Sequence, residues 1–470
     1  MATQLVTPAV PGPSPIPLLG WRGNLFQFYR DPLAYMWQLY RTYGEIAGYV
    51  AGRNGFVFAF GPTYNHQILS NPDLFHSYLV AIPFPPDSAA ERLNSGLICM
   101  NGERHRQHRR LIQPTFHKQQ VETYRDDMVL LTERMLEQWR PGMRLDIERT
   151  MQQLTMRIAA KTLFGLDSVP DAQRIGRIFI DVLDLASSPV ATFAPVNVPG
   201  SPYARLLATA ERAETHLRAM IGAKRTATTR THDVLTTLIH TRDETGETMT
   251  DAELVGHAYV LFTAGHETTS NALTWALFLL SQHPQVLMDL TDEVQGLLRG
   301  AAPTVAQLGQ LPLLERVIKE SMRLLPPAYV GGRRTTEPVH VGPYPLPEGA
   351  TVLFSQYITH RLPDLYPEPQ RFLPDRWQSI SPSIYEYLPF GAGARMCIGA
   401  TFAMMELKIV LAMLLQRYWL TLTPGARIAR QVTINLSPRY GMPMTVGLAG
   451  QPIRHVAVRG NIREMVDLED

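Results

Sequence analysis

The 470-residue chain contains only two cysteines, Cys99 and Cys397. Two thiols cannot form a disulfide framework, and they exclude a cysteine-rich zinc or iron–sulfur site. This scarcity is typical of a reducing compartment, so we expect a cytoplasmic protein. Apolar residues make up 45% of the chain, an ordinary globular share. A chain of this length buries enough surface to enclose both a cofactor and a substrate.

The chain also lacks an excess of charge of either sign, because 44 basic side chains face 42 acidic ones. No overall field would recruit nucleic acid or an anionic membrane, so any electrostatic partner must bind a local patch. Residues 1–17 have neither the basic nor the apolar segment of a secretory signal or membrane anchor. The apolar stretch 254–280 contains Glu267, and a carboxylate near the centre of a span costs roughly 2.5–3.5 kcal/mol. We therefore expect a buried helix there and no membrane span.

Hydrophobic periodicity and turn residues predict one mainly helical domain, residues 1–470, with a small β part. Helices are expected over 102–139 with a break near Pro114, and over 151–166, 203–224, 251–282, 313–325 and 400–418. A hairpin is expected over 46–60, and a strand pair over 339–354 with its turn at 345–349. Irregular segments are expected over 81–94, 187–202 and 361–389, with a proline-rich lead-in at 1–20 and a C-terminal extension at 451–470.

The strongest local signal is the loop of residues 390–399, which reads FGAGARMCIG. Cys397 lies just before a predicted helix, where unpaired N–H groups and the helix dipole favour a thiolate. The glycines permit tight turns and the close approach of a flat ligand. Arg395 can bring positive charge to an anionic group, and Phe390 can shield the sulfur from water. A shielded thiolate is what a strongly donating iron ligand requires.

Two other interpretations of this loop are weaker. The first is a buried cysteine that packs as a small hydrophobic side chain. The glycine, arginine and aromatic residues at fixed offsets from Cys397 argue against it. The second is a dinucleotide-binding loop, but Met396 stands where that motif needs its third glycine.

A polar segment, AGHETT at residues 264–269, interrupts the predicted long helix. Glycine inside a helix costs roughly 1 kcal/mol relative to alanine. A threonine there can bond back to the carbonyl four residues earlier and bend the helix. The groove that results could face a planar cofactor, with Thr268 and Glu267 as a proton relay to bound dioxygen. A polar kink in a buried helix is the alternative.

The two segments together resemble the cytochrome P450 monooxygenases. The loop matches the family signature F-x-x-G-x-R-x-C-x-G through Phe390, Gly393, Arg395, Cys397 and Gly399. The resemblance implies the cytochrome P450 fold, with haem b (iron protoporphyrin IX) buried between the long central helix and the cysteine loop. It makes Cys397 the iron ligand.

The resemblance also assigns roles on the long helix. Ala264 and Gly265 would face the haem, and Thr268 would protonate bound dioxygen with the help of Glu267. His266 occupies a variable position of the family pattern and receives no role.

A charged pair, Glu320 and Arg323, lies three residues apart on a predicted helix and would alone be a surface pair. The resemblance adds Arg376 and implies a buried structural cluster that locks the segment presenting Cys397. It further implies that the haem propionates are held by His105, Arg109, Arg333 and Arg395. A zinc site at His105, His108 and His117 is disfavoured by the arginines between them.

Basic side chains crowd the helix predicted around residues 102–118, with Glu103 as their one acid; they are Arg104, Arg106, Arg109, Arg110 and Lys118. This is either a solvated basic face or the docking surface of an acidic electron-transfer protein. The chain has no flavin fold or iron–sulfur motif of its own. Electrons would therefore come from NAD(P)H through a separate reductase and a ferredoxin- or flavodoxin-type donor. We expect a monomer.

Four regions border the substrate in this family, and here they supply mostly apolar and aromatic side chains, each of which could equally be ordinary core. The lining is predicted to be Ile82, Phe84, Leu97, Tyr259, Phe262, Thr263, Ala328, Tyr329, Val330 and Tyr440. An apolar organic substrate, hydroxylated or epoxidised, fits this set. The alternatives are a peroxide-using haem–thiolate enzyme and a haem-binding sensor without catalysis. A hydrolase is the weakest, because no G-x-S-x-G motif occurs.

Overall fold

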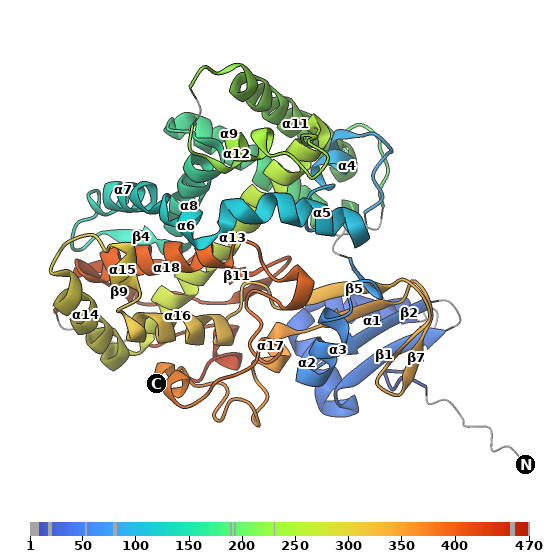
Figure 1. The fold of residues 1–470 in the computed structure, drawn as a ribbon. Coiled ribbons are helices and arrows are strands. Elements are labelled where there is room, and N and C mark those ends of the chain that lie inside the picture. Colours follow the sequence, from blue (N-terminus) through green and yellow to red (C-terminus); the bar gives the residue numbers. More distant parts are fainter. Residues whose placement is uncertain are drawn as a thin grey trace, which may run out of the picture.

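The computed structural model describes residues 9–16, 21–51, 54–78, 82–188, 190–191, 194–229, 231–451 and 456–468. In Figure 1, strands β1, β2, β5 and β7 lie with helices α1 to α3 on one side, and the larger helices make up the rest. The mainly helical fold with a small β part is confirmed. No helix in this described part is long and apolar enough to cross a membrane.

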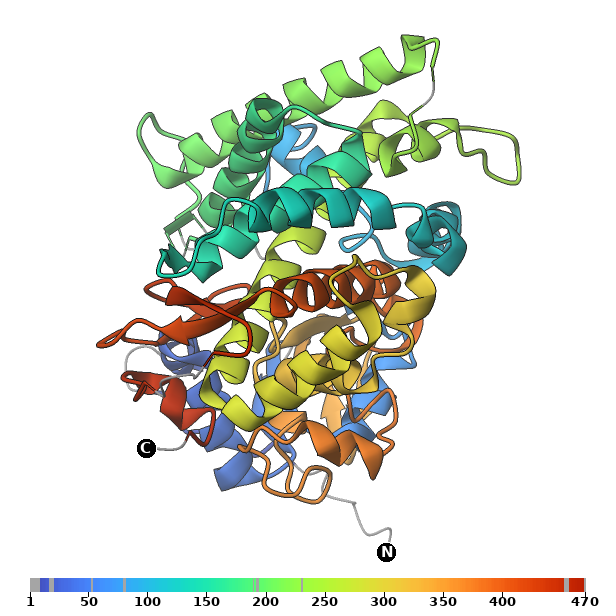
Figure 2. The ribbon, with the colours of Figure 1, turned by 90° about the vertical axis from the view of Figure 1, so that its left-hand side faces the viewer.

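The long central helix α13 runs from Asp251 to Gln282, as the sequence predicts. It begins with a capping box. The Thr250 side chain accepts from the Glu253 amide, and the Glu253 side chain accepts from the Thr250 amide. It ends one residue before Pro284, which starts the next helix. Figure 2 shows α13 passing obliquely through the middle of the molecule, and most of its second half is buried. The helix is therefore a rigid axis for the site.

The helices of the N-terminal half are α1 (Trp21–Arg30), α2 (Pro32–Tyr43), α3 (Pro62–Leu69), α4 (Ala89–Leu93), α5 (Gly102–Ile112), η1 (Gln113–Phe116), α6 (Lys118–Glu122), α7 (Arg125–Leu136), α8 (Ile147–Phe164), α9 (Val169–Ala186), α11 (Pro202–Thr226) and α12 (Val234–His240). The break expected near Pro114 is the 3-10 turn η1. One expectation is wrong: α4 forms inside the predicted loop 81–94, because the Ser88 hydroxyl caps it by accepting from the Glu91 amide.

The C-terminal half contributes α14 (Pro284–Leu298), α15 (Val305–Leu308), α16 (Pro312–Leu324), α17 (Gln356–Thr359), η2 (Pro374–Gln378), η3 (Gly393–Arg395), α18 (Ala400–Leu415) and η4 (Asn461–Glu464). The helix expected over 400–418 ends earlier, because Tyr418 begins a strand. The extension is folded onto the body, since Ile462, Met465 and Val466 are fully buried.

The strands are β1 (Ile46–Ala51), β2 (Asn54–Ala59), β3 (Phe75–Ser77), β4 (Arg144–Asp146), β5 (Gly331–Thr335), β6 (Val339–Val341), β7 (Tyr344–Leu346), β8 (Thr351–Phe354), β9 (Tyr418–Leu422), β10 (Arg430–Val432), β11 (Leu436–Pro438) and β12 (Pro443–Leu448). The main sheet has the order β1-β2-β8-β5-β3, with β2 and β8 parallel. Smaller sheets join β4-β12-β9, β10-β11 and β6-β7.

The hairpin expected over 46–60 is confirmed as the pair β1 and β2. The strand pair expected over 339–354 is wrong in its partners. The turn lies at Gly342, whose φ of 58° suits a glycine, so β6 pairs with β7. Strand β8 instead enters the main sheet between β2 and β5. The sequence signal at Pro345 was misread, because that proline sits in the ladder opposite His340.

Candidate active site

The loop that carries Cys397 is shaped by two glycines with positive φ, Gly391 (67°) and Gly393 (69°). A Cβ atom on Gly393 would lie 2.2 Å from the Leu69 carbonyl oxygen, so only glycine fits there. The Cys397 amide donates to the Phe390 carbonyl at 2.8 Å and closes the loop. Helix α18 starts three residues later. The backbone therefore holds Cys397 in one place.

The Cys397 side chain faces a hollow inside the protein. Burial raises the pKa of its thiol, while a bond from the Gly399 backbone and the nearby Arg109 guanidinium lower it. Yet the side chain keeps accessible surface, so the sulfur is not packed against neighbouring atoms. In the middle of α13, the Ala264 side chain is exposed, and a Cβ atom on Gly265 would meet nothing within 4 Å. These open surfaces fit a flat group that lies between the helix and the loop.

The hydroxyl groups of the polar segment on α13 bond back to the helix. Thr268 donates to the Ala264 carbonyl at 2.7 Å, and Thr269 donates to Gly265 at 2.8 Å. Burial raises the pKa of Glu267, a hydrogen bond with the Asn435 side chain lowers it, and Asp184 raises it again. Asn435 lies between β10 and β11, far along the chain. Sequence reasoning missed it because no local pattern marks it.

A partly buried cluster of positive charge surrounds His105. Burial and the guanidinium groups of Arg395, Arg109, Arg106 and Arg333 lower the pKa of His105 to about 4. Burial also lowers the pKa values of Arg333 and Arg395 to about 10 each. Buried charges of one sign are unfavourable unless an opposite charge joins them. An anion bound among these groups would offset their repulsion.

In the described part of the chain, Arg109, Arg333 and Arg395 have no acidic partner, whereas the exposed Arg106 pairs with Asp73 and Glu103. Among the described residues, no carboxylate acts on Arg333, and the Nε atom of Arg395 is buried without an acceptor. Arg109 donates to the Met396 carbonyl at 2.8 Å, directly beside Cys397. The Asn101 side chain, which the sequence did not single out, accepts from Arg395 at 2.7 Å. The two propionate carboxylates of haem fit these unsatisfied cations.

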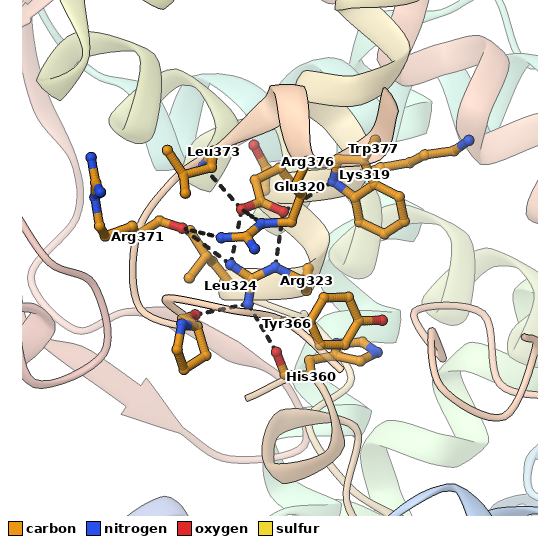
Figure 3. A network of polar contacts seen from close by, with 12 residues as sticks. Lys319, Glu320, Arg323, Leu324, His360, Tyr366, Arg371, Leu373, Arg376 and Trp377 are labelled. Carbon is orange, nitrogen blue, oxygen red and sulfur yellow. Dashed lines mark hydrogen bonds and ion pairs between the residues drawn. The ribbon is translucent and has the colours of Figure 1, made fainter. Parts of the chain in front are cut away.

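The structure brings Glu320, Arg323 and Arg376 together in a buried network (Figure 3). Glu320 accepts from Arg323 at 2.8 and 2.9 Å and from Arg376 at 2.9 Å. The sequence did not anticipate Trp377, whose indole N–H also donates to Glu320, at 3.0 Å. Arg323 further donates to the carbonyls of His360, Pro369 and Arg371, which ties α16 to the irregular segment before the Cys397 loop.

Comparison with known proteins decides the family. The family model described as Cytochrome P450 matches residues 10–436. The chain belongs to the cytochrome P450 family. It is 32% identical to cyclooctat-9-en-7-ol 5-monooxygenase of Streptomyces melanosporofaciens, over 88% of this chain and 90% of that one. Cyclooctatin synthase of the same species is 35% identical over 77% and 79% of the two chains.

Further relatives agree with this assignment. Pentalenene oxygenase of Streptomyces avermitilis is 29% identical over 93% of this P450 and 98% of that chain. Among solved structures, cyanobacterial CYP120A1 with retinoic acid bound superposes with a TM-score of 0.81 and 24% identity, covering 94% of this chain and 100% of that one. The fold is thus that of a P450, and the chain is a haem-binding P450 monooxygenase that uses dioxygen.

The residues expected to line the substrate pocket of this P450 fall into three groups. Ile82 and Phe84 border a cavity of about 390 Å³ that also touches Met100. The predicted lining residues on α13 and after Pro327 are half or fully buried. Among them, the Tyr329 hydroxyl also donates a hydrogen bond to the Thr433 carbonyl. Phe262 is fully buried and stacks on Phe164 at 5.6 Å, which favours core packing. Tyr440 is 53% exposed between Arg427 and Arg439, so we remove it from the lining.

The basic face predicted on α5 is largely neutralised. Arg106 pairs with Asp73 at 2.8 Å and with Glu103 at 2.9 Å. Arg104 pairs with Glu253 at 3.6 Å, and Arg110 pairs with Glu103 at 3.4 Å. Glu103 lies on α5 itself, but Asp73 and Glu253 come from other segments, so the sequence could not show those two pairings. The structure favours the interpretation of α5 as a solvated face.

Two buried histidines of α13 pack against neighbouring helices. The Nε2 atom of His257 lies 2.9 Å from the Nδ1 atom of His108 on α5. The Nδ1 atom of His266 lies 2.9 Å from the Thr155 hydroxyl on α8, so His266 has a packing role that the sequence did not indicate. Burial lowers the pKa of His266 to about 4. Burial and the electrostatic effect of the neighbouring His108 side chain lower the pKa of His257 to about 3.

We expect these histidines to make the protein sensitive to mild acid. Both are neutral in the fold, so they contribute fully above the unfolded pKa of 6.5 and lose that contribution as pH falls toward 4. At pH 5 each costs about 2 kcal/mol of unfolding free energy relative to pH 7. His257→Asn should flatten the dependence of the melting temperature on pH between 7 and 5. The exposed His232→Asn is the matched control, and equal slopes for the two variants would contradict the assignment.

Proposed function

We propose that this P450 hydroxylates or epoxidises an apolar, cyclic terpenoid-type hydrocarbon, with NAD(P)H electrons delivered by a separate ferredoxin- or flavodoxin-type donor and its reductase. Two observations carry the proposal: Arg333 and Arg395 have no acidic partner within the described ranges, and the Cys397 thiol keeps accessible surface. The names of the Streptomyces relatives, which refer to cyclooctatin and pentalenene, support the substrate class. The apolar side chains near Ile82 and Leu97 support it as well.

The protein would hold haem through four basic side chains and one thiolate. Arg109, Arg333 and Arg395 would bind the propionates together with neutral His105. Cys397 would bind the iron, and Gly265 would let α13 approach the ring. Haem bound in this way supplies an iron that activates dioxygen, so that one oxygen atom enters a C–H or C=C bond.

Proton delivery would fall to Glu267 and Thr268. Burial raises the pKa of Glu267, which favours the protonated carboxyl group that a proton donor needs. The Thr268 hydroxyl, now bonded to the Ala264 carbonyl, can rotate to pass that proton into the hollow. Glu267 would thus carry the proton, and the Oγ1 atom of Thr268 would direct it.

The electron donor would dock on the outer side of the Cys397 loop. A groove of about 510 Å³ lies there between α6, α16 and α18, and Phe390 forms part of its wall. Lys118, Lys319 and Lys408 stand around an apolar floor that includes Met404. Glu122 pairs with Lys118, and Glu315 pairs with Lys319 and Lys408, so the apolar floor would supply most of the contact with the donor. This groove replaces the α5 face as the preferred docking surface.

Thr268→Ala tests the proposal. We expect product formed per NADPH consumed to fall at least about tenfold and free peroxide to rise correspondingly, since positioned proton transfer contributes a factor of 10² or more. The assay measures NADPH, peroxide and product with surrogate redox partners. Thr269→Ala, which removes the neighbouring hydroxyl that is also bonded back to the helix, should leave coupling unchanged.

Two other results would contradict the assignment. Full activity of the wild type with peroxide alone, unaffected by Thr268→Ala, would favour the peroxide-using alternative. No substrate-dependent NADPH consumption across a terpenoid library would favour the sensor.

A further inference from the structure

The C-terminal segment 456–468 lies beyond the part of the chain that matches the family model, which ends at residue 436. It is nevertheless packed into the body of the protein. The buried Arg361 donates to the Met465 carbonyl at 3.0 Å, and the Asp467 amide donates to the Gln370 carbonyl at 2.9 Å. Val458, Ile462, Met465, Val466 and Leu468 of this segment are buried. The segment is therefore a fixed part of the fold.

This segment binds strand β10 and the residues before it through hydrogen bonds and an ion pair. The Ile428 amide donates to the Arg459 carbonyl at 2.7 Å, and the Arg430 amide donates to the Asn461 side chain at 2.9 Å. The Arg430 guanidinium, 6% exposed, pairs with Glu464 at 2.5 Å. A Cβ atom on Gly460, at a φ of 111°, would lie 2.1 Å from the Ile428 carbonyl oxygen. The two backbones are thus in contact, with backbone and side-chain bonds on both sides of Gly460.

The turn between β10 and β11 is held on its other side by the walls of the site. The Leu436 amide donates to the Pro327 carbonyl at 2.9 Å, and the Trp275 indole of α13 donates to the Leu436 carbonyl at 3.0 Å. The Tyr329 hydroxyl donates to the Thr433 carbonyl at 2.7 Å. The turn is therefore set between α13, the segment after Pro327 and the C-terminal segment.

Asn435 stands at this turn, one residue before the Leu436 carbonyl that binds Trp275 of α13, and its side-chain amide lowers the pKa of Glu267 on the same helix. Asn435 is 6% exposed, so the contact is shielded from water. Within the described ranges, no basic side chain acts on Glu267. The position of the Glu267 carboxyl group thus depends on Asn435, and the position of Asn435 depends on the turn.

We propose that residues 456–468 act as a clamp on the β10–β11 turn, and that Asn435 is thereby the positioning residue for Glu267. The inference rests on the proposed role of Glu267 in proton delivery. A loosened clamp lets the turn move away from α13, and Glu267 then loses the neighbouring Asn435 amide. The consequence is release of peroxide instead of oxygenated product.

The test compares three variants of the full-length holoprotein. Asn461→Ala with Glu464→Gln opens the clamp, and Asn435→Ala removes the positioning residue. Glu133→Gln is the control, because it removes a comparable ion pair, with Arg417 at 2.8 Å, on a different surface. Amide hydrogen exchange of residues 428–438 is measured first, and peroxide per NADPH second.

We expect the clamp variant to speed exchange of this segment about tenfold and to raise peroxide release about twofold or more. Asn435→Ala should raise peroxide release without faster exchange at Ile428 and Arg430. Combining both changes should release no more peroxide than Asn435→Ala alone, because both act through one contact. Glu133→Gln should change neither measurement.

Unchanged exchange in the clamp variant would overturn the inference, and so would faster exchange with unchanged peroxide release. Additive effects in the combined variant would also overturn it, since the segment would then act by another route. Hydrogen exchange does not depend on turnover. Failure of the clamp is therefore distinguishable from failure of the proposed proton delivery, which Thr268→Ala tests separately.

Discussion

Cys397→Ala is expected to abolish oxygenation and the thiolate signature in the absorption spectrum of the reduced, carbon monoxide-treated protein. Mutating residues that only orient a metal ligand lowers activity by up to about 100-fold. Loss of the ligand itself should therefore lower activity by more than that. The fold should survive, because the side chain faces a hollow and supports little packing. Circular dichroism and the carbon monoxide spectrum measure these two effects.

Cys99→Ala is the matched control and should leave the spectrum unchanged. Cys99 is half-buried, its thiol lies 3.8 Å from the Asn94 side chain, and burial raises its pKa. It therefore cannot supply a thiolate in place of Cys397. An unaltered spectrum in Cys397→Ala would mean that the iron has a different ligand.

Glu320→Ala is expected to lower the free energy of unfolding by about 3–5 kcal/mol. The buried guanidinium groups of Arg323 and Arg376 would lose their counterion, and the Trp377 indole would lose its acceptor (Figure 3). Burial works to raise the pKa of Glu320, but Arg323 and Arg376 outweigh it and leave that pKa below its usual value. Denaturant unfolding monitored by fluorescence measures the loss.

The control for this change lies on the same helix. Glu315 is 39% exposed and pairs with Lys319 and Lys408, so Glu315→Ala should cost less than about 1 kcal/mol. Similar losses at both positions would show that the Glu320 network contributes no more than a surface pair. Haem retention should also fall in Glu320→Ala, because Arg323 ties α16 to the segment before the Cys397 loop.

Much of the site could be predicted because its signals are local. Both ends of α13 follow from Thr250 with Glu253 and from Pro284, and the shape of the Cys397 loop follows from its glycines. The residues that determine the chemistry of that loop are ten consecutive positions, 390–399. Where one short segment determines a structure, its sequence is enough.

The rest depends on contacts between distant segments. Asn101, Trp377 and Asn435 have no local pattern, and each gains its role from a partner far along the chain. Strand β8 was misassigned for the same reason, since a four-residue strand does not reveal which neighbours it joins. Two of the acids that neutralise α5, Asp73 and Glu253, also lie on other segments, which is why the basic face looked less paired in the sequence.

The crowd of positive charge around His105 has a consequence for how the protein is made. Arg109, Arg333 and Arg395 lie on α5, β5 and the Cys397 loop. Before an anion binds, the positive charges of these three segments repel one another. Capture of the porphyrin removes that repulsion and, by mass action, stabilises the fold. Recombinant cells starved of iron or porphyrin precursor should therefore yield less intact protein, and feeding the precursor should restore the yield.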